Sequence, residues 1–436
     1  MNHQEAKDIL QRKLSPSALS LIKIEVFRLS WLGKGYNVIG EETGYDHDYV
    51  RKAGSELWKE LSKALACSVT KRNFRPLLED MLITEGKLNC DTPEYPGAAL
   101  AFSSPFYIER SQEEALAYQE IKRPGSIVRI KGPRKMGKSS LMLRVLDQAD
   151  VEDYQKVIID FQLADRSTLS NLDALLRWIC FQITSQLGID SVIDDYWNEL
   201  IGSKLSCTTY LQQYILTQQS KPIILVFNEL NIIFDFDDVS RDFLPLLRSW
   251  HEESKHNQVM TKIRQVLIYS TEIYVQLDIN LSPFNVGLPI ELAPFTGEQL
   301  EQLTRVYGFN FAHDGTANSP ITLLLQKLGG HPYLVQLALY ELATKFDFIE
   351  SPSSALKTLL DTAGKPDGLF SDFLQQILLD MLNNDNAIKA FNKFLDKQPL
   401  TRIELYLLER MGLVKIKNDQ AVAISQLMVD FLRGNL

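Results

Sequence analysis

One segment of eight residues has the composition and spacing of a phosphate-binding loop. Residues 132–139 read Gly-Pro-Arg-Lys-Met-Gly-Lys-Ser, which satisfies the pattern G-x-x-x-x-G-K-[ST] in full. The glycines let the backbone curl so that successive N–H groups point at one anion, and the N-terminus of a following helix adds partial positive charge. The nucleotide-binding residues that we expect are therefore Gly132, Pro133, Arg134, Lys135, Met136, Gly137, Lys138, Ser139 and Ser140.

Two side chains of this loop have distinct expected roles. The Lys138 ammonium should reach the β- and γ-phosphates, and the Ser139 hydroxyl should bind Mg²⁺. An apolar run at 126–130 precedes the loop and a helical run at 139–148 follows it, as the motif requires. The sequence therefore predicts ATP or ADP, together with Mg²⁺, as cofactors.

The second part of an ATPase site is a carboxylate at the end of a nearby strand. The apolar run 223–227 ends in Asn228 and Glu229, where the usual pair is Asp-Glu. Glu229 is the candidate general base for the attacking water. Because the Asn228 amide carries no charge, both metal affinity and activation of the γ-phosphate should fall. We predict that nucleotide binds and is hydrolysed slowly, unless Asp160 or another displaced acid holds the metal.

Other polar groups could report on the γ-phosphate. The apolar run 266–269 is followed by Ser270, Thr271 and Glu272, which either sense the phosphate or only cap the strand end. The candidate arginines for a γ-phosphate contact are Arg134, Arg241, Arg248 and Arg264, and the sequence does not choose among them.

The elements around these residues predict the fold. Apolar runs at 126–130, 157–160, 223–227 and 266–269 alternate with helical patterns at 139–148 and 172–187. This alternation indicates an α/β domain, a parallel sheet with helices on both faces. Helical patterns also fill the region before residue 82 and the region after residue 296. Near the end, 413–417 and 420–424 resemble a hairpin flanked by helices, the outline of a winged helix.

Several separate segments resemble one known family. Residues 104–110, 129–131, 277–289 and 329–334, in this order around the loop, are similar to the bacterial AAA-like ATPase domain of the STAND class of signal-transduction NTPases. The resemblance spans about 104–346 and implies a nucleotide-controlled switch. Gly330-His331-Pro332 resembles the G-x-P motif of that class, which implies that Pro332 approaches the nucleotide. Pro332 could also simply begin a helix after a Gly-Gly turn. The family typically has Asp-Glu where this chain has Asn228-Glu229.

The N-terminal region resembles a helix-turn-helix domain. Residues 36–45 and 49–52 are similar to the domain at the front of vWA–MoxR-associated proteins of bacterial conflict systems, and to the DNA-binding part of sigma factors and response regulators. Residues 16–75 contain ten Lys and Arg against seven Asp and Glu, a local net charge of +3. The candidate DNA contacts on the expected recognition helix are Tyr49, Arg51, Lys52 and Lys59. The alternative is a module that docks a protein.

The amino-acid composition excludes several classes of protein. The 436 residues include 46 Lys and Arg against 55 Asp and Glu, so the net charge of −9 excludes a uniformly basic nucleic-acid binder. The four cysteines and six histidines have no metal-ligand spacing. No apolar run approaches the length of a membrane span. We expect a soluble, cytoplasmic protein that binds a nucleotide, with double-stranded DNA as a candidate partner, and either a protein partner or a homo-oligomer, and with no membrane partner.

These observations predict a chain in five parts. They are a helix-turn-helix domain at 1–83, a linker at 84–101, a P-loop AAA-like domain at 102–295, a helical lid at 296–380 and a winged-helix-like domain at 381–436. The expected function is an ATP-binding signalling switch, at most a weak ATPase, that couples its nucleotide state to DNA or protein binding through the helix-turn-helix. Two alternatives stay open: an active AAA+ motor or loader on DNA-bound complexes, and a scaffold with permanently bound ADP.

Overall fold

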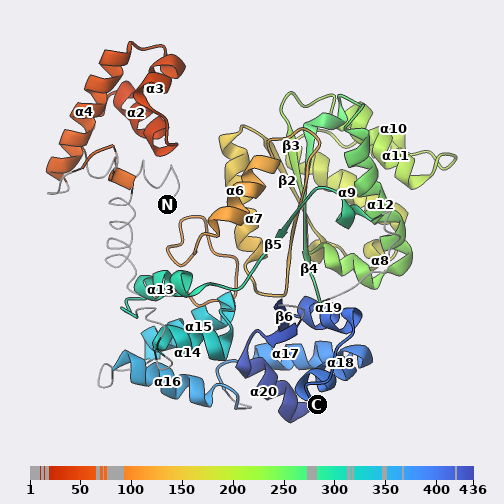
Figure 1. Ribbon diagram of the computed structural model, residues 1–436. Helices are drawn as coiled ribbons and strands as arrows, with labels where there is room; N and C mark the ends of the chain where they lie inside the picture. The colour runs from red at the N-terminus through yellow and green to blue at the C-terminus, as the bar shows by residue number, and fades with distance from the viewer. Residues whose placement is uncertain are drawn as a thin grey trace. The chain divides into compact units, whose positions relative to one another are not determined.

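The computed structural model describes residues 10, 14, 19–64, 69–71, 73–75, 93–272, 282–311, 316, 319–345, 351–365, 368–417 and 420–436. The chain divides into two compact units, Met1–Pro93 and Glu94–Leu436, and Figure 1 traces both. The boundary falls inside the expected linker, of which 84–92 lie outside the described residues. The finer domain boundaries within the second unit stay predictions.

In the described part of the first unit, three helices pack together: α2 (Leu21–Trp31), α3 (Tyr36–Thr43) and α4 (His47–Ala64). Gly44 adopts the left-handed conformation that ends α3, with φ of 71°. Asp46 caps α4, because its Oδ1 accepts the N–H of Asp48 at 2.9 Å. The Trp58 indole donates to the Tyr36 hydroxyl at 2.8 Å and joins α4 to α3. The core includes an aromatic cluster of Phe27, Trp31, Trp58 and Phe74.

The second unit is built on a five-stranded parallel sheet in the order β2-β3-β4-β1-β5. The strands are β1 (Ile127–Gly132), β2 (Gln155–Asp160), β3 (Ile223–Asn228), β4 (Ile263–Ser270) and β5 (Leu288–Glu291). Gly132 pairs with Ser270 and Asp160 with Asn228, so the carboxyl ends of four strands meet at one edge. Sequence patterns did not indicate β5. Its Pro289 has no N–H, which is tolerated because β5 lies at the edge of the sheet.

Helices cover both faces of this sheet. In β3, Ile224 and Val226 pack with α6 (Ser111–Glu120) and α7 (Lys138–Val151), while Ile223, Leu225 and Phe227 pack with α9 (Leu172–Leu187) and α12 (Asp237–Glu253). This two-sided packing confirms the expected α/β P-loop fold. Short elements connect these helices and strands: η2 (Phe161–Leu163), α8 (Arg166–Leu169), α10 (Ile193–Tyr196), α11 (Gly202–Tyr210), the π-helix η3 (Leu211–Ile215), η4 (Leu230–Asp235), η5 (Met260–Lys262) and η6 (Pro283–Asn285).

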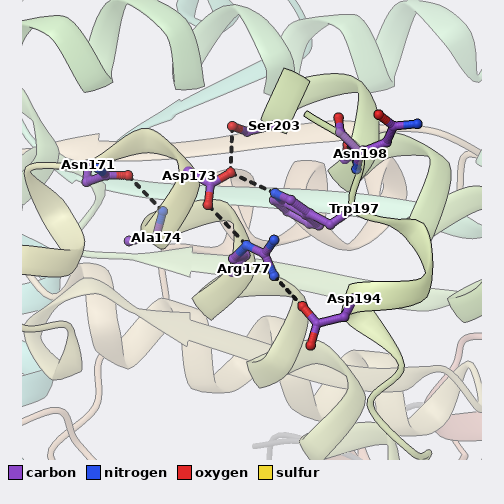
Figure 2. A network of polar contacts seen from close by, with 9 residues as sticks. Asn171, Asp173, Ala174, Arg177, Asp194, Trp197, Asn198 and Ser203 are labelled. Carbon is purple, nitrogen blue, oxygen red and sulfur yellow. Dashed lines mark hydrogen bonds and ion pairs between the residues drawn. The ribbon is translucent and has the colours of Figure 1, made fainter. Parts of the chain in front are cut away.

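A network of polar side chains organises the segment between α9 and α11 (Figure 2). Asp173 accepts hydrogen bonds from the Trp197 indole at 2.7 Å, from the Ser203 hydroxyl at 2.8 Å and from Arg177 at 3.0 Å. Arg177 continues to Asp194 at 2.8 Å. Partial burial opposes the effect, but the hydrogen bonds hold the pKa of Asp173 below its usual range. The Asp173 network therefore fixes the loop that carries Trp197.

The C-terminal part of the second unit is mostly helical and has its own core, which also includes Phe106 and Ile108. Its helices are α13 (Gly297–Val306), α14 (Pro320–Leu328), α15 (Pro332–Lys345), α16 (Pro352–Thr362), α17 (Ser371–Leu382), α18 (Asp385–Leu395), α19 (Arg402–Arg410) and α20 (Gln426–Asn435). The antiparallel strands β6 (Val414–Lys417) and β7 (Gln420–Ala423) form the expected hairpin, whose turn at 418–419 lies outside the described residues. Its assignment as a winged helix stays a prediction. None of the helices in the described ranges is long and apolar enough to cross a membrane.

Candidate nucleotide site

The phosphate loop connects β1 to α7 and faces a cavity of about 880 Å³. Lys135 and Gly137 adopt positive φ angles of 58° and 96°, which curl the loop so that α7 begins at Lys138. Residues 133–140 all line the cavity, and Gly132 contributes its carbonyl just behind them. The structure therefore places the nine expected nucleotide-binding residues together.

The Lys138 side chain is buried and held in place. Its ammonium donates to the carbonyls of Gly132 at 3.0 Å and Pro133 at 2.8 Å. Burial lowers the pKa of Lys138, and the carboxylates of Glu272 and Glu229 oppose this shift. The cation is thus fixed at the bottom of the loop and faces two acidic side chains.

The two serines at the start of α7 have different surroundings. Ser140 Oγ accepts the N–H of Leu100 at 3.0 Å and so ties the segment 96–100 to the loop. Ser139 lines the cavity on the first turn of the helix, where a magnesium ligand is expected. Within the described ranges, no group of three His, Cys, Asp or Glu could hold a metal ion alone. A magnesium ion here would therefore depend on phosphate oxygens and water for its other ligands.

Of the last residue of β3, Asn228, and the residue after it, Glu229, only Glu229 reaches the cavity. Glu229 adopts a left-handed backbone conformation, with φ of 52°, and lines the cavity. The Asn228 amide instead donates to Asp160 Oδ2 at 3.1 Å, and its Oδ1 is buried without a partner among the described residues. Asp160 also accepts the N–H of Gln162, so both of its oxygens are engaged. Asn228 and Asp160 thus pair with each other, while Glu229 faces Lys138.

Glu272, just beyond the end of β4, bends back to the phosphate loop. Its Oε1 accepts the backbone N–H of Arg134, and its Oε2 is buried without a partner among the described residues. Burial raises the pKa of Glu272, and Lys138 and the Arg134 amide oppose this shift. From the sequence, 270–272 are expected either to sense the γ-phosphate or to cap the strand end. The only available signal for this contact was an acid following the strand beside β1.

The Gly329-Gly330 turn brings three residues to the cavity. Gly330 adopts a φ of 70° and packs so closely against the Phe295 carbonyl that a Cβ would come within 2.3 Å of it. Its carbonyl accepts the N–H of Phe295 at 2.8 Å. His331, Pro332 and Tyr333 then line the cavity, and α15 begins at Pro332. Pro332 therefore has both of the positions considered for it, a cavity wall and a helix start.

His331 is a buried neutral side chain beside the loop. Burial lowers its pKa to about 3, with the cations of Lys138 and Lys135 adding to the shift and the Arg134 backbone opposing it. Neither ring nitrogen makes a well-formed hydrogen bond within the described part of the chain. The ring lies against Phe373 of α17, with centroids 5.0 Å apart.

Arg110 is a cavity residue that sequence analysis missed. Its guanidinium donates to the carbonyl of Met136 at 2.9 Å and lies 4.9 Å from the centre of the Phe295 ring. Its Nε is buried without a partner among the described residues. Its backbone N–H donates to Glu114, which also accepts the Tyr107 hydroxyl. The signal available was its place in the segment that precedes the loop.

The four candidate arginines differ in their distance from the phosphate loop. Of the four, Arg134 lines the cavity. Arg264 is the second residue of β4, at the opposite end of the sheet, and donates to the carbonyl of Ile121. Arg241 pairs with Asp237 and Arg248 with Glu252, both along α12.

The C-terminal part of the second unit contacts both the phosphate loop and the residue that follows β4. The Arg134 guanidinium lies 3.4 Å from Asp380 of α17. The Thr271 hydroxyl donates to the carbonyl of Arg410 at 2.7 Å, and Arg410 Nε donates back to the Thr271 carbonyl at 2.9 Å. Gly412, with φ of 72°, packs on Pro133, since a Cβ there would lie 2.9 Å from the proline ring. We call these three contacts the C-terminal clamp.

In the first unit, α4 presents the candidate DNA contacts to solvent. Tyr49, Arg51, Lys52 and Lys59 are all exposed. The ring of Tyr49 lies 5.5 Å from that of Tyr45, and both rings are about half exposed. Among the described residues, the three cations make no ion pair, whereas Lys23 pairs with Glu60 and Lys34 with Glu42.

Comparison with solved structures gives distant matches. A Walker-type ATPase of Pyrococcus abyssi is 14% identical over 75% of this chain and 96% of its own, with a TM-score of 0.49. ORC2 of Aeropyrum pernix, in ADPNP and ADP complexes, is 14% identical over 79% and 97%, with a TM-score of 0.41. ORC1 of the same organism, in complex with DNA, is 10% identical over 76% and 93%, with a TM-score of 0.34.

Sequence comparison is more decisive. No curated protein matches the chain. The family model of the vWA–MoxR-associated N-terminal helix-turn-helix matches residues 1–81. The model of the AAA-like domain matches residues 95–434, which include the phosphate loop, the sheet and the C-terminal helices. The chain therefore belongs to the AAA-like domain family and has an N-terminal helix-turn-helix domain of the vWA–MoxR-associated type.

Proposed function

We propose that this protein is a nucleotide-controlled switch of the STAND type that binds ATP or ADP with Mg²⁺. The observation that carries the proposal is the composition of the cavity. One wall is the phosphate loop with Lys138 and Ser139, and the facing wall comes from C-terminal helices and the Gly330 turn. A phosphate chain in this cavity would contact both walls. Its length would therefore favour some arrangements of the C-terminal part over others.

We further propose that hydrolysis is slow. Asn228 supplies no charge near the metal, and its amide is engaged by Asp160 on the neighbouring strand. Glu229 would be the remaining candidate base, since it lines the cavity. A bound triphosphate would then persist long enough to act as a signal. An active motor or loader requires the opposite, a fast and repeated turnover.

The output of the switch is proposed to be DNA or protein binding by the helix-turn-helix domain. Exposed Tyr49, Arg51, Lys52 and Lys59 on α4 support a phosphate-contacting surface. Asp46 and Asp48 at the start of the same helix oppose it, because the N-terminal end of a recognition helix meets the DNA. Acidic character at this end equally suits docking to a basic protein surface.

The first experiment is a titration of the full-length chain with ATP and ADP in the presence of Mg²⁺, after co-purified nucleotide has been extracted and identified. Wild type should bind both nucleotides, and Lys138→Ala should lose binding by about 100-fold or more, because the ion contact to the phosphates is lost. The matched control is Lys156→Ala, which removes an exposed lysine paired with Asp150 on the same domain. Absence of binding by stripped wild type, or equal binding by Lys138→Ala, would refute the proposal.

The second measurement separates a switch from a motor or a scaffold. Turnover of ATP is followed over time, and oligomeric state and binding to double-stranded DNA are recorded with ATP and with ADP. Slow turnover with a state-dependent change in assembly or DNA binding supports the switch. Fast turnover supports the motor, and ADP that cannot be exchanged supports the scaffold.

A further inference from the structure

The Glu272 carboxylate lies at the end of the phosphate loop that serves the terminal phosphate. The Lys138 ammonium marks this end, because that lysine reaches the β- and γ-phosphates. Glu272 raises the pKa of Lys138 more than Glu229 does, and it accepts the loop N–H of Arg134. An anionic side chain therefore holds a loop amide and faces the loop cation, which are the groups that an anionic phosphate would require.

The other phosphates do not compete with this carboxylate. The N–H groups at the start of α7, from Lys138 to Ser140, and the N-terminus of the helix itself cradle the phosphates nearer the nucleoside. These groups follow the left-handed turn at Gly137, whereas Glu272 contacts Arg134, three residues earlier. A diphosphate can thus be bound while Glu272 keeps its contact.

A third phosphate meets a charge conflict. Glu272 and Glu229 both face Lys138, and the cations that act on Glu272 are Lys138 and Arg134, whose guanidinium pairs with Asp380. Further cations line the cavity, among them Lys135, which lies over the Tyr333 ring, and Arg110, which donates to the Met136 carbonyl. Two like charges within a few ångströms of each other in a partly buried site repel strongly. A γ-phosphate must therefore displace the Glu272 carboxylate or neutralise it with a proton.

We infer that Glu272 determines the nucleotide preference of the site by competing with the γ-phosphate, so that the clamped form binds a nucleoside diphosphate more tightly than a triphosphate. This inference deepens the proposed function and rests on it. Displacement of Glu272 would also act on the C-terminal clamp. Thr271, the preceding residue, holds Arg410 through two hydrogen bonds, and Arg134 holds Asp380. Triphosphate binding and release of the C-terminal helices are thereby linked.

The test compares ADP with a non-hydrolysable ATP analogue, each with Mg²⁺, on full-length wild type and Glu272→Gln. Wild type should prefer ADP. Glu272→Gln, which keeps the size of the side chain and removes the charge, should bind the triphosphate at least about tenfold more tightly and ADP within about twofold. The matched control is Glu152→Gln, which neutralises a surface acid paired with Lys122 and should leave both affinities unchanged.

A second measurement covers the case in which the Gln variant fails to fold. In wild type, the affinity for the triphosphate relative to ADP should rise as the pH falls, because protonation neutralises Glu272, and burial moves this titration above the usual carboxyl range. A folded Gln variant would lack this part of the pH dependence and retain only the titration of the nucleotide phosphates.

The outcomes separate the inference from the function on which it rests. If both nucleotides bind through Lys138 but Glu272→Gln leaves their ratio unchanged, the inference fails and the switch proposal stands. If Glu272→Gln weakens triphosphate binding, Glu272 supports the metal or the phosphates, and the inference is again wrong. If wild type binds neither nucleotide, the proposed function itself fails.

Discussion

Two polar clusters of the second unit differ in how fully their hydrogen bonds are satisfied. In the Asp173 network of Figure 2, one carboxylate accepts from Trp197, Ser203 and Arg177, and Arg177 continues to Asp194. Around the phosphate loop, buried polar atoms lack partners among the described residues. These atoms are Arg110 Nε, Glu272 Oε2 and the two ring nitrogens of His331.

The difference indicates what each cluster is for. Buried polar groups in native proteins are nearly always hydrogen-bonded, so each exception requires an explanation. In the Asp173 network, the carboxylate uses its hydrogen bonds to hold the loop that carries Trp197 in place. The cavity cluster keeps donors and acceptors in reserve beside a phosphate-binding motif, at a cost in stability. We therefore expect mutations in the Asp173 network to change stability alone, and mutations in the cavity to change ligand binding and pH dependence.

The largest expected effect is a loss of stability at low pH, caused by the buried His331 of the cavity cluster. His331 has a pKa of about 3 in the folded chain, whereas an unfolded histidine titrates near 6.5. The unfolded state therefore binds a proton that the folded state excludes, and the free energy of unfolding should fall by about 1.4 kcal/mol per pH unit between about pH 6 and pH 4. Denaturant unfolding of wild type and His331→Gln at several pH values should show a steeper loss in wild type. Equal slopes would contradict the prediction.

The next effect concerns the satisfied cluster. Asp173→Ala should lower the free energy of unfolding by about 1 kcal/mol, since it removes the hydrogen bonds from Trp197, Ser203 and Arg177 at a half-exposed site where water can replace part of them. Nucleotide affinity should remain within about twofold of wild type, because the network belongs to the α9–α11 segment and not to the cavity lining. Chemical denaturation and nucleotide titration on the same samples check both statements. A large loss of affinity in a folded variant would break the contrast between the clusters.

The sequence predicted local features of the site better than those made by packing. The phosphate loop, the strands around it and Glu229 follow from consecutive residues whose pattern carries the information. Glu272 and Asp380 reach the loop only because β4 lies beside β1 and α17 packs over the loop. Their contacts with Arg134 join residues more than 100 positions apart, and no periodicity of 2 or 3.6 residues encodes them. Arg110 reaches Met136 over 26 positions, and Asp173 reaches Ser203 over 30, so these contacts also lie beyond the range of a local periodicity.

A smaller effect concerns catalysis. Asn228→Asp places a charge at the end of β3, which should raise the rate of ATP hydrolysis by about tenfold if the new carboxylate reaches the metal. The Asp160 carboxylate, 3.1 Å from the Asn228 amide, limits the gain, because two adjacent acids resist ionising together. The double variant Asn228→Asp, Asp160→Asn reverses the pair and should be faster still. A single variant with the wild-type rate would show that Asn228 does not set the rate.

The smallest effect concerns the first unit. If the helix-turn-helix domain binds DNA, Lys59→Ala should weaken binding only modestly, and it should reduce the dependence of log affinity on log salt by about one unit. Binding is measured at several salt concentrations on one duplex. The control is Lys23→Ala, which removes a lysine already paired with Glu60 and should leave the salt dependence unchanged. Salt-independent binding would favour a protein partner instead.

Gly412 gives the C-terminal clamp a mechanical property. The segment after α19 touches Pro133 of the phosphate loop only because position 412 has no side chain and accepts a φ of 72°. Any larger residue there would act as a wedge, because its Cβ would lie 2.9 Å from the Pro133 ring, inside van der Waals contact, and the loop and this segment would have to move apart. The distance between the phosphate loop and the C-terminal part would then be determined by the size of the side chain at position 412, and not by the strength of the hydrogen bonds and ion pair of the C-terminal clamp.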